Sequence, residues 1–212
     1  MNNNIFCMKP FTIPLVRMYV DEDTSELKSC NLYTRSNLQI QTDGNDEVDS
    51  MKYYRILEEF PTTKFLLNAY VNKILNETIG YNADFAITTS WITLTTKNTK
   101  SQTHIHKNSF WSGVYYFDDD YGKNAGRLEF RNPIPHLSSF LPGIKEGEIN
   151  SVTANEIYIK PRSKMLILFP SYVYHEVALH KEDIDRHSLA FNIIPTGLYG
   201  NGDSMCDTSW IN

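Results

Sequence analysis

The chain has 212 residues, 41% of them apolar and 13% aromatic, which is enough to bury one sizeable core, so we expect a single domain over residues 1–212. The formal net charge is -5, and lysines and arginines are scattered singly. This pattern excludes a basic patch for a phosphate backbone, so we expect no nucleic-acid partner. No apolar run could cross a bilayer and no signal-like segment opens the sequence, which indicates a soluble, unexported protein.

The cysteines indicate a reducing compartment. Cys7, Cys30 and Cys206 lie far apart, are odd in number and form no Cys-x-x-Cys pair. Neither a disulfide framework nor a cysteine zinc site is expected, so a cytoplasmic location fits best.

The N-terminal third carries a weak strand signal and a stronger helical one. Apolar residues alternate over 11–15, which predicts a short strand, and the polar stretch 21–29 predicts a loop. Residues 45–80 predict two helices, the second starting near Pro61 and ending at Gly80. The apolar residues at helical spacing are Val48, Met51, Tyr54 and Leu57 in the first, and Leu67, Val71, Ile74 and Leu75 in the second.

From residue 84 to about 197 the pattern is that of short strands rich in Thr, Ile, Val, Tyr and Phe. It predicts an α+β fold that is mainly β: a jelly roll or barrel core, with N-terminal helices at about 45–80 packed on one sheet. The long Pro- and Gly-containing connection 133–151 is either a lid or, as we favour, a surface loop. The expected strands are 84–95, 103–106, 111–117, 127–130, 156–159, 164–169, 173–177 and 188–194.

Two histidines in the expected strand 103–106 are candidate metal ligands. Residues two apart on a strand point to the same face, so His104 and His106 should converge. Unprotonated imidazole binds iron, zinc or copper well, but two ligands hold a metal loosely. A third ligand must therefore come from elsewhere in the fold.

His175 is the best candidate for that third ligand, because it follows a buried-looking apolar run and begins another strand-like segment. His136 lies in the Pro-rich loop, His180 in a polar stretch, and His187 between Arg186 and Ser188 on the opposite strand parity. For these last three histidines a surface or packing role is favoured.

The segment 186–192 predicts an anion site. Arg186, Ser188 and Asn192 share one face of the expected strand. The guanidinium fork binds a carboxylate through two hydrogen bonds, and a neighbouring hydroxyl can add a third. The alternative is an Arg186 that pairs at the strand edge with Asp183 or Asp185.

Five segments occur in a fixed order along the chain: Gln102–Ser109, Ser112–Phe117, Leu168–Pro170, His175 and Arg186–Asn192. As an ordered set they resemble the 2-oxoglutarate/iron(II) oxygenase family of marine bacteria and their phages. The resemblance covers roughly residues 90–200, extends to the N-terminal part only loosely, and is shared more distantly with the prolyl hydroxylases. It implies a double-stranded β-helix, and a hydroxylase that uses Fe(II), 2-oxoglutarate and dioxygen in the cytoplasm of a bacterium or phage-infected host.

The resemblance also implies roles for individual residues. The second tyrosine of the pair Tyr115–Tyr116 would contact the 2-oxoglutarate carboxylate, although a shift of one position would exchange the two tyrosines. Gln102, Asn108 and Asn192 neighbour the proposed ligands and are the candidates for substrate binding. Iron would be held by His104, His106 and His175, and 2-oxoglutarate by Arg186, Ser188 and Tyr116, with no catalytic residue beyond the metal centre.

One residue departs from the family pattern. Related oxygenases usually carry Asp or Glu where this chain has His106, which gives two histidines and one carboxylate. Here the site is either a three-histidine one, as we favour, or a two-histidine one whose open position is filled by water, an anion or a carboxylate such as Glu129.

Two other functions compete with a 2-oxoglutarate oxygenase. A cupin-type dioxygenase would bind iron through three histidines without 2-oxoglutarate, and a peripheral Arg186 would favour it. A non-catalytic jelly-roll binding module would use aromatic side chains such as Trp91, Trp111, Tyr121 and Trp210. The sequence singles out no prime substrate, and a homodimer is a reasonable expectation for a soluble enzyme.

Overall fold

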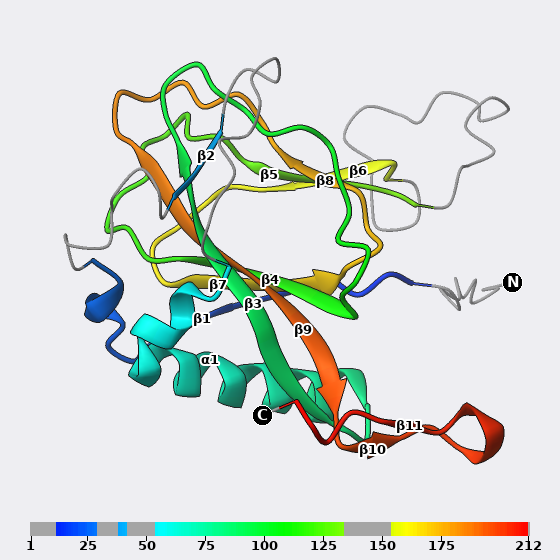
Figure 1. Ribbon diagram of the computed structural model, residues 1–212. Coiled ribbons are helices and arrows are strands. Elements are labelled where there is room, and N and C mark those ends of the chain that lie inside the picture. Colours follow the sequence, from blue (N-terminus) through cyan, green and yellow to red (C-terminus); the bar gives the residue numbers. More distant parts are fainter. Residues whose placement is uncertain (1–11, 29–37, 42–53, 134–153, 212) are drawn as a thin grey trace, which may run out of the picture.

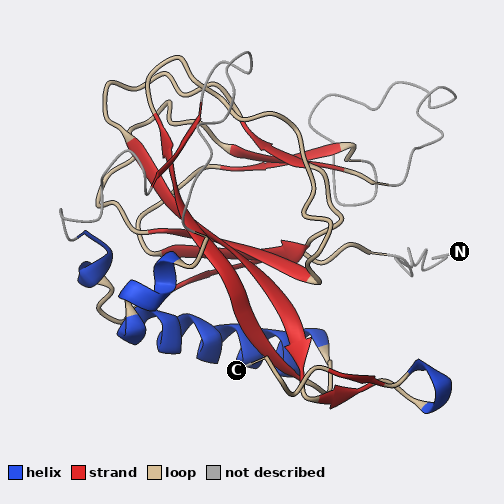
Figure 2. Cartoon of the chain, viewed as in Figure 1, coloured by secondary structure: helices blue, strands red, loops and turns tan. Residues whose placement is uncertain are grey.

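The computed structural model describes residues 12–28, 38–41, 54–133 and 154–211. It is mainly β, with a six-stranded sheet facing a three-stranded sheet and one α-helix packed against the outer face of the larger sheet (Figure 1). Figure 2 shows the α-helix and its neighbouring helical turns beneath the larger sheet, on the side away from the smaller sheet. No helix of the described residues has the length and apolarity needed to span a membrane.

The larger sheet has the strand order β1-β7-β4-β9-β3-β2. All neighbouring strands are antiparallel except β2 and β3, which are parallel. Its two longest strands, β3 and β9, pair along their whole length, with an irregularity between Ile87 and Thr89. The strands are β1 (Val16–Tyr19), β2 (Leu38–Gln41), β3 (Asp84–Thr95), β4 (Trp111–Tyr116), β7 (Met165–Pro170) and β9 (Arg186–Thr196).

The smaller sheet has the order β6-β5-β8, and a C-terminal hairpin extends beyond the end of β9 (Figure 1). Its strands are β5 (Leu128–Arg131), β6 (Glu156–Ile159) and β8 (His175–Val177), and those of the hairpin are β10 (Leu198–Tyr199) and β11 (Cys206–Asp207). The helical segments are η1 (Ser25–Lys28), η4 (Ile56–Glu59), α1 (Pro61–Lys73), the π-helical η5 (Ile74–Ile79) and η7 (Gly202–Ser204).

Strand alternation divides the buried side chains between two cores. On β4, Tyr115 packs into the core beneath α1, whereas Val114 and Tyr116 pack into the core between the sheets. All six β4 residues are buried. Strand β4 is therefore covered on both of its faces, and its inner face, which carries Tyr116 beside Arg186, is shielded from water.

The second expected N-terminal helix is confirmed, since α1 and η5 run from Pro61 to Ile79 and end at Gly80, but the end of the first expected helix is wrong. Residues 48–53 lie outside the described part, but Tyr54 and Leu57 do not belong to an α-helix: the Tyr54 carbonyl accepts from the Ser90 N–H, and the Leu57 N–H donates to the Ser90 hydroxyl. Because these backbone groups form hydrogen bonds with β3, they are not available for the hydrogen bonds of a helix. One α-helix, with Leu67 and Val71 buried, supports the sheet instead.

Most core strands match the sequence-based expectation, with two exceptions. The expected strand 103–106 is wrong, since His104 makes only an isolated bridge to His175 and the His106 N–H donates to the Ser171 carbonyl. A ladder continued from that bridge would pair His106 with Val173, but its N–H bonds two residues away at Ser171, so no ladder forms. The first strand lies at Val16–Tyr19 instead of 11–15, and the connection 133–151 lies almost wholly outside the described residues.

Gly113 on β4 is required by a close approach of side chains. A Cβ at this position would lie 2.2 Å from Phe191 Cζ and 2.9 Å from Leu168 Cδ2. We expect Gly113→Ala to lower the free energy of unfolding by about 1–3 kcal/mol, as overpacked cores do. Urea denaturation measures the change, and Phe191→Leu in the same chain should restore part of the loss. An unchanged stability of the single variant would contradict this packing.

Candidate functional site

Three histidine side chains lie close together between the two sheets. The nitrogen atoms that His104, His106 and His175 could offer to a metal all lie within 4.8 Å of one another. The ring centroids are 4.3 Å apart for His104 and His175, 5.0 Å for His106 and His175, and 5.2 Å for His104 and His106. Among the residues that the structure describes, this is the one group of His, Cys, Asp and Glu side chains close enough to hold a metal ion.

The backbone fixes the positions of these histidines. His104 and His175 exchange two backbone hydrogen bonds, each of 3.0 Å, across their bridge. The His106 N–H donates to the Ser171 carbonyl at 3.0 Å. The expected convergence of His104 and His106 is therefore present, although a pair of separate contacts produces it and not a regular strand.

Each imidazole has its Nδ1 directed at a hydrogen-bond acceptor. The Nδ1 atoms of His104 and His175 lie 2.8 Å and 2.9 Å from the carbonyl oxygens of Gln102 and Val173. A carbonyl can only accept, so both Nδ1 atoms carry the proton. The Nε2 atoms then hold free lone pairs, which is the tautomer that a metal requires.

The third histidine is held by a side-chain network. His106 Nδ1 bonds to Asn192 Oδ1, and the Ser112 hydroxyl lies 3.1 Å from each of these atoms. Asn192 Nδ2 donates to Thr89 Oγ1 at 2.9 Å, which sets the amide so that its oxygen faces the ring. Ser112 Oγ is also 2.7 Å from Ser171 Oγ. The network gives His106 the same tautomer as the other two histidines.

The surroundings keep the imidazoles of His106 and His175 neutral. Burial lowers the pKa of His175 to about 3, and the neighbouring His104 adds to the effect. Burial also lowers the pKa of His106. Trp91 lies 5.5 Å from His106, and Phe169 4.7 Å from His175, as ring centroids. Neutral, pre-oriented imidazoles are suited to bind a divalent metal without first losing a proton.

Removal of the Asn192 amide is expected to weaken metal binding. Groups that orient a ligand contribute about 10- to 100-fold to metal affinity, so Asn192→Ala should reduce Zn(II) affinity by that factor. Competition against a chelator measures it. Asn124→Ala, at an exposed position, is the control and should bind as the wild type does. An Asn192→Ala chain with unchanged affinity would contradict the role assigned to the network.

Arg186 lies at the start of β9, wholly buried. Its guanidinium donates to Tyr116 Oη at 3.0 Å, Ser188 Oγ at 3.3 Å and Thr95 Oγ1 at 3.4 Å, and its Nε finds no hydrogen-bond partner in the described part of the chain. The guanidinium carbon is 5.1 Å from the Tyr116 ring centroid. Neutral hydroxyls surround a charge that is always present.

No carboxylate of the described residues pairs with Arg186. Asp183, one of the two partners considered from the sequence, binds Lys97 at 2.6 Å instead. A buried, unpaired charge is costly, and one with an open N–H is suited to receive an anion. Burial raises the pKa of Tyr116, which keeps its phenol protonated and able to donate a hydrogen bond to the same anion.

The two neighbouring tyrosines face opposite sides of the sheet. Tyr116 contacts Arg186 between the sheets, whereas Tyr115 packs beneath α1 with its hydroxyl 2.8 Å from Thr24 Oγ1. The second tyrosine is thus the one beside the arginine.

The other sequence-predicted residues lie outside this cluster. Glu129 binds Arg127 and is not part of the metal-binding group. Gln102 is exposed and contributes its carbonyl to His104, while Asn108 is exposed and lines a neighbouring cavity. His180 is buried with its Nε2 2.7 Å from the Ile184 carbonyl oxygen, and His187 lies 3.3 Å from Asp118. His136 lies outside the described residues.

Sequence reasoning missed several supporting residues. Thr95 beside Arg186, and Thr89 and Ser112 around Asn192, are brought in by strand register: Thr95 pairs with Arg186, and both Thr89 and Ser112 pair with Asn192. A single sequence carries no signal for that register. Of these three residues, Ser112 alone belongs to one of the five segments that carry the family resemblance.

Comparison with known families points to the same segment. Residues 89–192 match the model of a family described as "Putative 2OG-Fe(II) oxygenase". The match includes all three histidines, Arg186 and Asn192, and no curated protein matches the sequence. The origin in marine bacteria or phages remains a prediction.

Several solved structures are similar to the chain. An oxidoreductase of the 2OG-Fe(II) oxygenase family from Burkholderia pseudomallei is 14% identical, with a TM-score of 0.47 over 63% of this chain and 55% of the other. A prolyl-4-hydroxylase from Pseudomonas putida is 18% identical, with a TM-score of 0.41 over 61% and 62%. HygX from Streptomyces hygroscopicus, with nickel and 2-oxoglutarate bound, is 11% identical, with a TM-score of 0.49 over 87% and 83%. The matches thus span less than two thirds of the first two of these proteins.

Proposed function

We propose that this protein is a non-haem Fe(II), 2-oxoglutarate-dependent oxygenase that hydroxylates a second substrate. The observation that carries the proposal is the burial of Arg186, which has no carboxylate partner among the described residues. It lies on the same inner sheet face as Asn192, the side chain that holds His106. A metal centre alone would have no need of that cation. A dicarboxylate that reaches from the metal to the arginine would satisfy both.

The residues present fit both groups. His104, His106 and His175 would hold the iron through Nε2, and imidazole is a usual ligand for it. Three protein ligands leave positions for the cosubstrate and dioxygen. The bound iron and 2-oxoglutarate supply the oxidative chemistry, in which decarboxylation of the cosubstrate is coupled to hydroxylation of the substrate.

The protein's own share is positioning and exclusion of water. Arg186 and Tyr116 would donate to the far carboxylate of 2-oxoglutarate, and Ser188 lies 3.3 Å from the guanidinium to assist. Ala190 and Val114, which pair across β9 and β4, lie farther along the same inner face and offer small apolar side chains toward the methylene groups. Because this region is buried, the charge-assisted hydrogen bonds act at low dielectric.

A three-histidine dioxygenase that does not use 2-oxoglutarate is the second candidate. It is favoured by His106, since three neutral ligands leave the metal without the usual carboxylate. Arg186 separates the two candidates, because that enzyme would have no anion for it to bind.

Anaerobic titration of Fe(II) into metal-free protein, with and without 2-oxoglutarate, tests the proposed function. We expect the weak visible charge-transfer band of the iron chelate to appear only when both are present. Iron binding without such a band would favour the three-histidine dioxygenase. Absence of any metal binding would leave a jelly-roll binding module.

A further inference from the structure

Two cavities adjoin beside the metal centre. The first, of about 520 Å³, is lined in part by His106, and the second, of about 580 Å³, reaches Tyr199 at the base of the C-terminal hairpin. They lie side by side because they share wall residues, and we refer to the pair as the aromatic groove. The shared residues are Tyr81, Lys107, Ser109 and Phe110.

Aromatic rings form the wall of this groove. Phe110 lies 5.3 Å from Tyr81 and 6.1 Å from Phe85 between ring centroids, the latter pair nearly parallel, and Tyr81 meets Trp111 edge-on at 6.5 Å. Tyr81 is 38% and Phe110 40% exposed, so both rings present a free surface. Large rings held in place by one another are a preformed surface for a flat or apolar ligand.

The charge on the groove has a single sign. Among the residues that the structure describes, its lining contains no Asp or Glu, although the chain has 25 of them against 20 Lys and Arg. Lys107 lines both cavities, is exposed, and has no carboxylate partner in the part of the chain that the structure describes. An unpaired cation beside aromatic rings is complementary to a ligand that carries one anionic group on an apolar body.

We propose that the aromatic groove binds the prime substrate and that this substrate is an aromatic carboxylate. Its carboxylate pairs with Lys107, its ring packs on Tyr81 and Phe110, and its other end extends toward His106. The assignment of this ligand as the substrate rests on the proposed function, whereas its binding is inferred from the residues of the aromatic groove alone.

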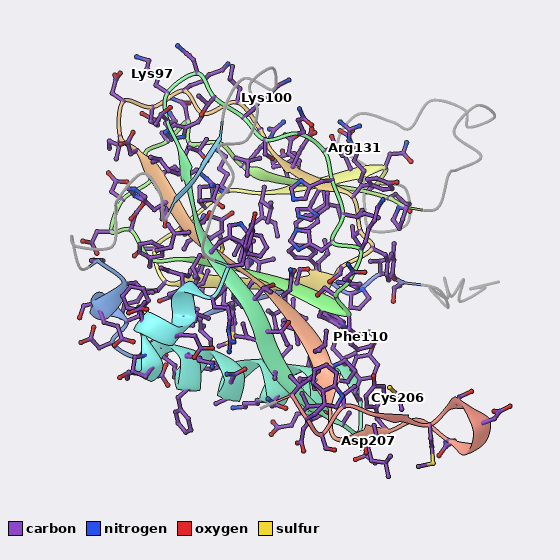
Figure 3. All side chains as sticks on the ribbon, in the orientation of Figure 1. Lys97, Lys100, Phe110, Arg131, Cys206 and Asp207 are labelled. Carbon is purple, nitrogen blue, oxygen red and sulfur yellow. The ribbon has the colours of Figure 1, made fainter. Side chains whose placement is uncertain are left out.

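Binding of 2-naphthoate and of the neutral 2-naphthamide to metal-free protein tests the site. Lys107→Met should weaken naphthoate binding about tenfold and leave naphthamide unchanged, because it removes one charge-assisted hydrogen bond. Phe110→Ala should weaken both ligands about tenfold. The control is Lys100→Met, an exposed lysine that Figure 3 shows at the opposite end of the molecule from Phe110. Calorimetry gives each affinity.

Two results would overturn the site. One is a naphthoate affinity that Lys107→Met leaves unchanged. The other is displacement of naphthoate by 2-oxoglutarate in metal-free protein, which would place the probe at Arg186.

Proximity to the metal tests the link to catalysis. With Mn(II) and saturating 2-oxoglutarate bound, the proton relaxation of naphthoate should increase strongly over that measured with Zn(II), and the increase should be lost in Lys107→Met. If naphthoate binds through Lys107 but its proton relaxation does not increase with Mn(II), the aromatic groove is not the substrate site. A chain that binds no Mn(II) but binds naphthoate through Lys107 would overturn the oxygenase proposal and leave the anion site standing.

Discussion

Replacement of His175 by alanine is expected to lower the affinity for Fe(II) by more than about 100-fold, because loss of a group that merely orients a ligand already costs about 10- to 100-fold. His175 is 4% exposed, and its neutral imidazole faces the two other histidines. No fourth His, Cys, Asp or Glu of the described residues is close enough to replace it. Anaerobic Fe(II) titration against a chelator measures the loss.

Two variants make this result specific. His187→Ala removes a histidine that contacts Asp118 outside the cluster, so it should leave the Fe(II) affinity unchanged. His106→Asp supplies the carboxylate that is usual in iron oxygenases and should retain binding, whereas His106→Ala should lose it. Circular dichroism shows whether each variant is folded. A folded His175→Ala chain with wild-type affinity would remove this histidine from the ligand set.

The strands of the core could be predicted because their residues decide their structure locally. Met165–Pro170 is apolar throughout and buried throughout, as in a strand with a core on each side. Trp111–Tyr116 likewise combines aromatic and β-branched residues. In both segments, propensity and burial favour the same element, so the prediction needed no tertiary information.

The end of the first expected helix, at Tyr54 and Leu57, could not be excluded from the sequence, because contacts with a distant strand decide its structure. Helical spacing at Tyr54 and Leu57 is real, but their backbone groups bind Ser90 on β3. The same limit applies to His104 and His106, where the expected strand is replaced by two separate backbone contacts while the convergence of the rings remains. Residue identity at the right spacing predicted the cluster, and long-range hydrogen bonds built it.

The environment of Arg186 lay beyond sequence reasoning for a different reason. An Arg-x-Ser pair at a strand start is as compatible with an exposed ion pair as with a buried site. The register of β9 against β3 places Thr95 beside Arg186, and the pairing of β4 with β9 brings the Tyr116 hydroxyl within hydrogen-bond distance of it. Burial without a carboxylate became visible only once the sheet was assembled.

Replacement of Arg186 by methionine is expected to raise the 2-oxoglutarate concentration needed for binding by about 30-fold or more, since truncation of one partner of a buried, hydrogen-bonded charge pair costs about 2–5 kcal/mol. Methionine fills a similar volume without charge, so metal binding should be retained. The charge-transfer band with Fe(II) measures the change. Arg127→Met, at an exposed position just before β5 where the arginine pairs with Glu129, is the matched control and should bind 2-oxoglutarate normally.

The Arg186→Met variant should bind 2-oxoglutarate more weakly than the wild type, but without ligand it should be at least as stable. Without ligand, Arg186→Met removes a buried charge that no carboxylate of the described residues pairs with, so its melting temperature should equal or exceed that of the wild type. With Mn(II) present, 2-oxoglutarate should then stabilise the wild type much more than the variant, because only a ligand that binds the folded state raises stability. Equal stabilisation of both chains by 2-oxoglutarate would show that Arg186 does not bind the cosubstrate, and the three-histidine dioxygenase would become the better explanation of the site.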